Sequence, residues 1–383
     1  MRSLRSCRAA IWISLATLGC ATGALGGCSS TPDAASNGAG AAAGGATSGG
    51  SSAGTAPTAG AAASGGSAAA SAGASSGGTS QSVGGAAGSS SGGASNAGGM
   101  SGAGGTAGAS SSDRSPAGTC ARWKADTANM DEGTWSGSVD ACDAGDISAV
   151  GRENALRLFN LMRWLADLPA VVTEDARNQQ AQACALMMTA NKMLSHMPPM
   201  DWKCYSDLGA NGASTSNISG GPGVSSVFDY LVDTGNETTF GHRRIVLSNE
   251  LGPIGLGSAG KGGSSCMQNI GGTGKATKAW LAWPPPGAFP IQAYADTYRR
   301  SLDDTGWSIQ SKDIVLSAAQ VTVSSAGQPL PVKVEQLTGT YGNAKAIRIV
   351  LDGWKAAAGS TYAVTVSGTA TPIAYEIQLI DCK

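Results

Sequence analysis

Two side chains in this chain of 383 residues are suited to metal binding or proton transfer near neutral pH, His196 and His242. Each lies at the end of a segment with helical periodicity. His196 ends an alanine-rich run, and His242 lies in the stretch Gly241-His242-Arg243-Arg244, which leads into apolar residues closed by glycines. The two helix ends are therefore the strongest functional signal in the sequence.

Three predicted helices position these histidines. The first covers residues 151–167, where leucines recur at spacings of three and four. The second has Thr173 as its N-cap and continues to His196, where two prolines stop it. The third covers residues 224–235.

Three apolar segments separated by glycines follow, as is typical of an antiparallel meander. They cover residues 245–257, 264–270 and 276–283. Helices followed by a small sheet predict a layered α+β domain over residues 151–286.

Five motifs follow one another along this region: Asn160-Leu161-Met162-Arg163-Trp164-Leu165, Leu194-Ser195-His196, Ser216-Asn217-Ile218, Tyr230 and Gly241-His242-Arg243. Their order and spacing resemble the CAP superfamily, the group of cysteine-rich secretory, antigen 5 and pathogenesis-related proteins, in its bacterial form. The resemblance covers residues 151–286. It implies an α-β-α sandwich with a central cleft.

The resemblance also implies a site in that cleft. In many members of the family the cleft holds two histidines and two acidic residues, which can bind a divalent metal. His196 and His242 match the histidines, and Asp233 stands where many members carry a glutamate. Ser216 replaces the other glutamate, next to Asn217 in the same motif. The resemblance therefore predicts a cleft lined by these five residues, with one acid missing.

Two uses of such a cleft are open on chemical grounds. His196, Asp233 and His242 make a three-ligand set for zinc or another divalent cation, with water as the fourth ligand. The same groups can instead form a hydrogen-bonded cluster without a metal. Glu237 could supply a substitute acid, although a loop glutamate more often faces solvent.

Other candidate groups favour packing over chemistry. The folded region contains no Gly-x-Ser-x-Gly elbow, which disfavours a serine hydrolase. Arg243 and Arg244 could bind an anion, but arginines beside a buried turn more often pair with local carbonyls or carboxylates. The remaining groups are more typical of core and sheet packing than of copper or sugar binding: Met187, Met188, Met193, Trp280 and Trp283.

A second domain is predicted over residues 287–383. After the break at Pro284-Pro285-Pro286-Gly287, short runs alternate apolar and polar residues between glycine-rich turns. This pattern predicts an all-β sandwich. Residues 359–368 resemble a late hairpin of bacterial immunoglobulin-like domains, and no polar cluster in the domain suggests catalysis.

The N-terminus is typical of an exported bacterial lipoprotein. Residues 1–27 form a predicted signal peptide, whose apolar run is too short to span a membrane. Its end, Leu25-Gly26-Gly27-Cys28, resembles a lipobox, which makes Cys28 the lipidated first residue of the mature chain. We expect a lipid anchor in the outer membrane, with the lipid bilayer as partner; an extracellular location is the alternative.

Residues 28–115 join this anchor to the folded region. From Ser30 onwards they are almost wholly Gly, Ala, Ser and Thr, without an aromatic residue, so they cannot form a core. We predict a disordered linker with an r.m.s. span of roughly 50 Å. The net charge of −1 and the absence of a basic stretch argue against a nucleic-acid partner.

Six cysteines remain after Cys28, and an even count in an exported chain predicts disulfides. No Cys-x-x-Cys pair occurs, which argues against a zinc finger. We expect two local pairs and one that joins the two domains: Cys120–Cys142, Cys184–Cys204 and Cys266–Cys382. In this interpretation residues 116–150 form a disulfide-stapled N-terminal arm.

Together these features predict a cell-surface protein whose first domain binds an envelope component, a lipid or another protein without catalysis. One alternative is a metal-dependent hydrolase that holds zinc through His196, Asp233 and His242. The other is a structural envelope protein. Zinc or another divalent cation is the one candidate cofactor.

Overall fold

The structure is a computed structural model that describes residues 112–383. The predicted signal peptide, the lipidated Cys28 and nearly all of the predicted linker lie outside the described residues. Residues 112–383 belong to one compact unit. Within this range no helix is both long enough and apolar enough to cross a bilayer.

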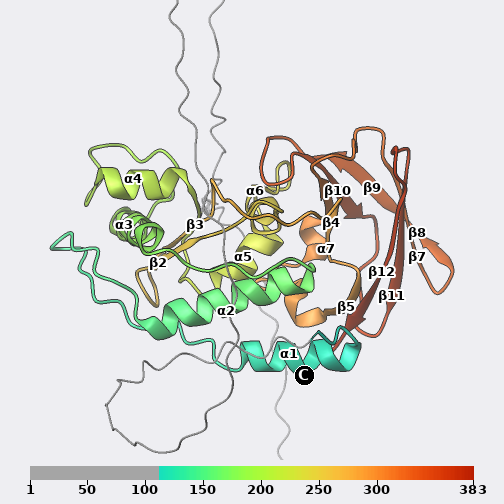
Figure 1. The fold of residues 1–383 in the computed structure, drawn as a ribbon, viewed down its shortest axis with the longest axis horizontal. Helices are drawn as coiled ribbons and strands as arrows, with labels where there is room; N and C mark the ends of the chain where they lie inside the picture. Colours follow the sequence, from blue (N-terminus) through green and yellow to red (C-terminus); the bar gives the residue numbers. More distant parts are fainter. Residues whose placement is uncertain (1–111) are drawn as a thin grey trace, which may run out of the picture. The chain divides into compact units, whose positions relative to one another are not determined.

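The first half of this unit is a small sheet with helices on both faces (Figure 1). Its elements are α1 (Pro116–Thr127), α2 (Ala149–Leu165), α3 (Asp175–Asn191), α4 (Asp207–Ser214), β1 (Ser216–Ser219), α5 (Ser226–Val232), α6 (Gly241–Val246), β2 (Gly255–Ser258) and β3 (Ser265–Gln268). Strands β1 and β2 both pair antiparallel with the central strand β3.

Strand β3 shows how the two helical layers form. Successive side chains of a strand point to opposite faces. Cys266 packs into a cluster with residues of α3 and α4, whereas Met267 packs into the main core with residues of α2, α5 and α6. Helices therefore cover both faces of the sheet, in agreement with the predicted α-β-α arrangement.

Helix α3 lies directly on the sheet because β2 carries glycines. A Cβ atom added at Gly257 would come within 2.2 Å of the backbone of Ala181, and one added at Gly255 within 2.2 Å of that of Arg177. Only glycine permits this approach. Gly255 and Gly257, which the sequence places after the Gly241 stretch, therefore allow α3 to pack closely on β2.

Two predicted elements near the histidines are wrong. Helix α3 ends at Asn191, where Lys192 adopts a left-handed conformation with φ 50°, so His196 lies in the following loop and not in the helix. Its N-cap is Glu174 and not Thr173. The predicted strand over residues 245–257 begins as the end of helix α6 and becomes a strand only at β2.

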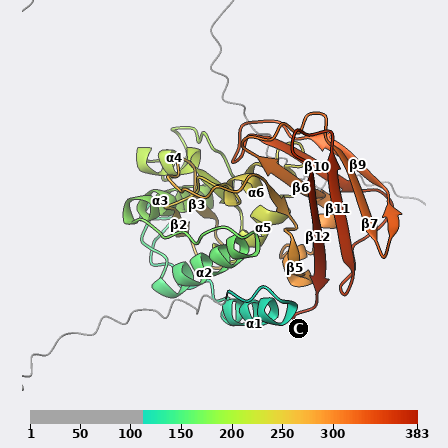
Figure 2. The ribbon, with the colours of Figure 1, turned by 45° about the vertical axis from the view of Figure 1, so that its right-hand side comes forward.

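The second half of the unit consists of two sheets (Figure 2). One has the order β4-β6-β10-β9 and the other the order β5-β12-β11-β7-β8. The strands are β4 (Leu281–Trp283), β5 (Gly287–Pro290), β6 (Trp307–Ser311), β7 (Gln320–Ser325), β8 (Gln328–Leu330), β9 (Val332–Gln336), β10 (Lys345–Leu351), β11 (Thr361–Ser367) and β12 (Ile373–Ile380), with the short helices η1 (Ile291–Tyr294) and α7 (Leu302–Thr305).

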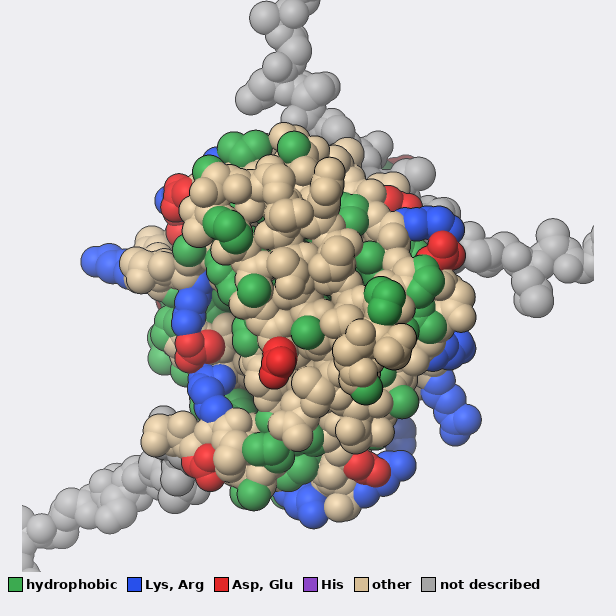
Figure 3. Space-filling view, turned by 90° about the vertical axis from the view of Figure 1, so that its right-hand side faces the viewer, with side chains coloured by type: hydrophobic (Ala, Val, Ile, Leu, Met, Phe, Trp, Pro, Cys, Tyr) green, Lys and Arg blue, Asp and Glu red, His purple; other side chains and the backbone are tan. Residues whose placement is uncertain are grey.

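The period-two pattern placed the later strands correctly. On β11, Tyr362, Val364 and Val366 are buried while Thr361 and Thr365 are exposed. Figure 3 shows the side of the unit that carries this sheet, where few charged side chains lie near the centre and lysines and arginines lie towards the rim. One prediction fails: β4 pairs with β6 of the second half, so it is not the third strand of the first sheet.

All three predicted cysteine pairs are wrong, although all six cysteines form disulfides. The observed pairs are Cys120–Cys382, Cys142–Cys204 and Cys184–Cys266. Pairing follows proximity in the fold and not in the sequence: α1 lies beside the C-terminus (Figure 1), and α3 lies on β3. The N-terminal segment is therefore stapled to the rest of the unit and not to itself.

The two halves share a hydrophobic core. One cluster of buried side chains extends from Leu158 and Phe159 of α2 to Trp283, Trp307 and Ile377 of the two sheets. A Cys266–Cys382 disulfide was predicted to join the two halves. Instead, the halves are joined by their shared hydrophobic core.

Candidate functional site

His242 is the second residue of α6, and its ring contacts Asp233. Nδ1 of His242 lies 3.0 Å from Oδ1 of Asp233; the histidine side chain is 21% exposed and the aspartate side chain is fully buried. An ionised carboxylate only accepts hydrogen bonds. Nδ1 also lies 3.3 Å from Nδ2 of Asn236, but the carboxylate is closer, so Nδ1 donates to Asp233. In the neutral ring Nε2 is then the acceptor. Asp233 thus orients the ring and fixes its tautomer.

The Asp233 carboxylate is held where α5 ends and α6 begins. Asp233 caps α5 in the left-handed conformation, with φ 56°, which aspartate tolerates better than most residues. Its Oδ2 accepts a hydrogen bond from the backbone N–H of Arg243 at 3.0 Å, and its Oδ1 accepts one from Nδ2 of Asn236 at 2.9 Å. With the contact to His242, three donors surround this carboxylate.

Asn217 links β1 to the same network. Its Nδ2 donates to the carbonyl of His242 at 3.2 Å, and its own carbonyl accepts a hydrogen bond from the Tyr230 hydroxyl at 3.2 Å. The ring centroids of Tyr230 and His242 are 5.2 Å apart. The structure therefore brings Asn217, Asp233 and His242 together, with Tyr230 packed beside them.

Ser216 leaves β1 on the opposite face from Asn217, since successive strand residues alternate. Ser216 and Asn217 are each 1% exposed. The Oγ of Ser216 and the Oδ1 of Asn217 have no hydrogen-bond partner among the described residues. Buried polar atoms are nearly always paired. Each of these two atoms can therefore take a hydrogen bond from a ligand or a water molecule.

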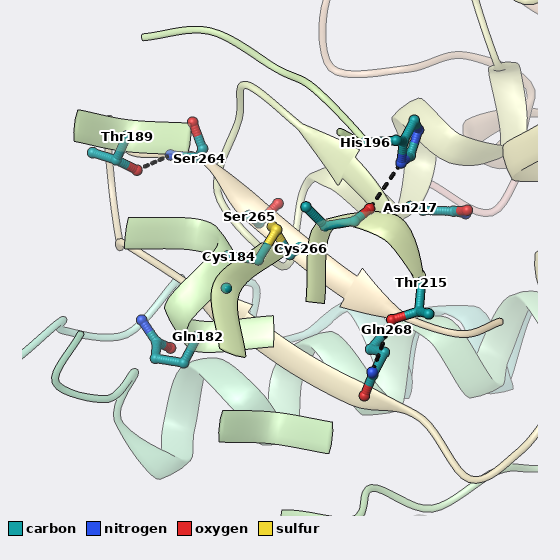
Figure 4. Close-up of a disulfide and its surroundings, with 12 residues drawn as sticks. Gln182, Cys184, Thr189, His196, Thr215, Asn217, Ser264, Ser265, Cys266 and Gln268 are labelled. Atoms are coloured by element: carbon teal, nitrogen blue, oxygen red, sulfur yellow. Dashed lines mark hydrogen bonds between the residues drawn. A yellow bond between two sulfur atoms is a disulfide. The ribbon is translucent and has the colours of Figure 1, made fainter. Parts of the chain in front are cut away.

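His196 reaches the site from the loop after α3. Its Nδ1 lies 2.9 Å from the carbonyl of Ala213, at the end of α4 (Figure 4). A carbonyl accepts only, so Nδ1 donates and Nε2 is free. Although part of the residue is exposed, partial burial lowers the pKa of His196, and the neighbouring His242 lowers it further. The two histidines therefore lie within electrostatic reach of each other.

The site does not fit the predicted zinc centre. A zinc site needs at least three protein ligands around one position. Asp233 lies on the Nδ1 side of His242, away from the free Nε2, and Ser216 offers no carboxylate. Among residues 112–383 no group of three His, Cys, Asp or Glu side chains is placed to hold a metal ion. Glu237 does not substitute, because its carboxylate accepts a hydrogen bond from Gly235 in its own loop.

Arg243 and Arg244 point away from the site and hold α6 in the fold. The guanidinium of Arg243 donates to the carbonyls of Leu231, Val232 and Gly306. That of Arg244 donates to five carbonyls, those of Thr239, Thr338, Gly339, Asn343 and Ala344. Burial lowers the pKa of Arg243 to about 9 and that of Arg244 to about 10. Both cations are used for structure, and neither is available to an anion.

The methionines and tryptophans divide between core and surface. Met187 and Met188 are fully buried and Trp283 packs edge-on against Phe289, as predicted. Met193 is 59% exposed, so its assignment to the core is wrong. The helix that would have buried it ends at Asn191.

Sequence reasoning missed two parts of the site. Asn236 was not considered, although Asp233-Thr234-Gly235-Asn236 has the composition of a turn in which side chains bind nearby groups. The contact of the Ala213 carbonyl with His196 could not be predicted, because every residue type has the same backbone acceptor.

Residues 156–269 match the model of the cysteine-rich secretory protein family, CAP. The matched segment runs from α2 to the loop after β3 and contains all five predicted cleft residues, which supports a CAP superfamily domain there. Together with the three disulfides, this match indicates an exported or extracellular protein. No curated protein and no solved structure matches the chain.

Proposed function

We propose that the part of the unit from α2 to β3 is a ligand-binding CAP domain of an exported protein, tethered to the cell envelope through a lipid on Cys28, and that the domain acts without catalysis. One observation carries this proposal: the Asp233 carboxylate lies on the Nδ1 side of His242, where it contacts three donors. The site thereby loses its only acid. One buried polar atom beside it, Asn217 Oδ1, has no partner among the described residues.

The free atoms suggest the chemistry of the ligand. Nε2 of the neutral His242 ring and Oδ1 of Asn217 are both acceptors. No free cation or carboxylate lies among them. A ligand rich in hydroxyl or amide donors fits this set better than an anion does. Among the predicted ligand classes, a glycan or glycopeptide polymer of the envelope has this chemistry.

A metal-dependent hydrolase has weaker support. It needs a third metal ligand and a general base near the metal-bound water. The one carboxylate of the site contacts three donors already and faces Nδ1 of His242.

A binding assay with the mature chain tests the proposal. The probes are peptidoglycan sacculi for retention and soluble muropeptides for titration, with phospholipid vesicles as a third arm. We expect retention by sacculi, and a loss of affinity of about fivefold in Asn217→Ala, as for one net hydrogen bond of about 1 kcal/mol.

The matched control is Ser367→Ala, on the exposed face of β11. It should bind as the parent chain does. Retention by vesicles alone, equal affinity of the parent and Asn217→Ala, or cleavage of the muropeptide during the titration would each overturn the proposal.

A further inference from the structure

The loop between α3 and α4 exposes an unusual set of side chains. Met193, Met197 and Met200 are 59%, 71% and 79% exposed, within eight residues that also contain His196. Methionine is among the residues most often buried, and a single exposed one needs no explanation. Here three exposed methionines lie within four residues of an exposed histidine, so one loop carries three thioethers and an imidazole.

The ends of this loop are held together. The side-chain amide of Asn191 donates to the carbonyl of Lys203 at 2.9 Å and accepts from the N–H of Lys203 at 3.0 Å. Next to this pair, Cys204 is bonded to Cys142. Residues 192–202 therefore form a closed loop, so its first and last methionines cannot lie at opposite ends of an extended chain.

The middle of the loop is also fixed. The N–H of Met197 donates to Oγ of Ser195 at 3.0 Å, which makes a bend beside His196. The Nδ1 of His196 is held by the carbonyl of Ala213. Such a contact on one ring nitrogen orients the other towards a metal. Nε2 of His196 is thus free on the side of the ring away from α4.

We propose that the loop of residues 192–202 binds a soft monovalent metal ion, Cu(I), through the thioethers of Met193, Met197 and Met200 and Nε2 of His196. Thioethers select soft ions such as Cu(I), while imidazole accepts several metals. Methionine side chains are unbranched and flexible, so they can close around an ion from an open loop. All six cysteines of the described region are in disulfides, so no thiol there competes.

The test is a titration of the mature chain with Cu(I), against a chromogenic chelator, and with Ag(I) as a surrogate that does not change oxidation state. The key variant is Met193→Leu/Met197→Leu/Met200→Leu, which keeps the apolar surface and removes the sulfur atoms. We expect one ion per chain in the parent, and an affinity at least tenfold lower in this variant and in His196→Gln.

Two controls separate this site from others. Met130→Leu removes a thioether elsewhere, and His242→Ala removes the second histidine of the site around Asp233; both should bind as the parent does. The proposal is overturned if the parent binds neither ion at micromolar concentration. It is equally overturned if the triple variant binds as tightly as the parent, or if His242→Ala loses the ion.

Discussion

Asp233 decides the character of the site through the atom that it contacts. Its position after α5 could be matched from the sequence, but its contact with Nδ1 of His242 could not, because this depends on the left-handed cap that turns the carboxylate towards α6. A carboxylate behind the ring orients a histidine. A carboxylate beside Nε2 would have made a third metal ligand.

A second acid, Asp229, lies one helical turn earlier. It accepts a hydrogen bond from Oγ1 of Thr297 at 3.2 Å. Burial raises the pKa of Asp229 to about 6, and the charge of Asp296 adds to this effect. The folded protein therefore holds a proton on Asp229 that the unfolded chain releases at lower pH.

The sign of the resulting pH dependence follows from linkage. A carboxyl whose pKa is raised by folding stabilises the protein when it is protonated, and this stability is lost as pH rises through about 6. The change in unfolding free energy caused by Asp229→Asn should therefore differ between the two pH values. Relative to the parent, the variant should be more stable at pH 7.5 than at pH 4.5, by on the order of 1 kcal/mol.

Urea unfolding of the parent and Asp229→Asn at both pH values measures this difference. Thr365→Ala, on the outer face of β11, is a control without a titrating neighbour of this kind and should show no change with pH. An equal effect of Asp229→Asn at both pH values would contradict the raised pKa.

Helix α6 is the element that joins the site to the two sheets. Arg243 follows His242 directly, and its guanidinium binds carbonyls of α5 and of Gly306 before β6. Its N–H simultaneously holds the Asp233 carboxylate. The orientation of His242 and the attachment of the second half therefore depend on the same short helix.

Arg243→Met should unfold the protein readily. The substitution leaves at least three buried carbonyls without donors, and each such loss costs about 1–3 kcal/mol. We expect a loss of at least about 3 kcal/mol of unfolding free energy by urea denaturation. Lys333→Met, which breaks an exposed ion pair with Asp352, is the control, with an expected loss below about 1 kcal/mol. Similar losses in both variants would show that Arg243 does not hold the two halves.

The elements that could be predicted are those whose signal is local. The apolar period of α2 and the alternation of β11 are written in adjacent residues, and both elements formed where expected. The end of α3 was missed because Asn191 is held by Lys203, across a loop. The partner of β4 was missed because strand pairing with β6 is decided by the packing of the whole unit.

At the scale of the whole molecule, a disulfide joins the two ends of the described region. Cys120 of α1 is bonded to Cys382, the residue before the last, at a separation of 262 residues. The start of α1, which the predicted linker precedes, therefore lies close to the C-terminus of the unit. Cysteine spacing alone could not reveal this, because every pairing of six cysteines is compatible with an even count.

Removal of this bond should loosen the N-terminal helix. Cys120→Ala/Cys382→Ala is expected to lower the unfolding free energy by about 2–5 kcal/mol and to expose residues 116–127 to limited proteolysis. Cys142→Ala/Cys204→Ala is the matched control variant. In this variant we expect cleavage near residues 142 and 204 and not in α1. Unchanged protection of α1 in the first variant would mean that packing on α2 and β5 holds the helix without the disulfide.

The most direct test of the central claim is a zinc titration of the mature chain beside its His196→Ala/His242→Ala variant, followed by calorimetry and metal analysis. If Asp233 serves only to orient His242, the parent takes up no stoichiometric zinc at micromolar concentration and behaves like the variant. Stoichiometric zinc in the parent that is lost in the variant would contradict the account and restore the metal-dependent hydrolase.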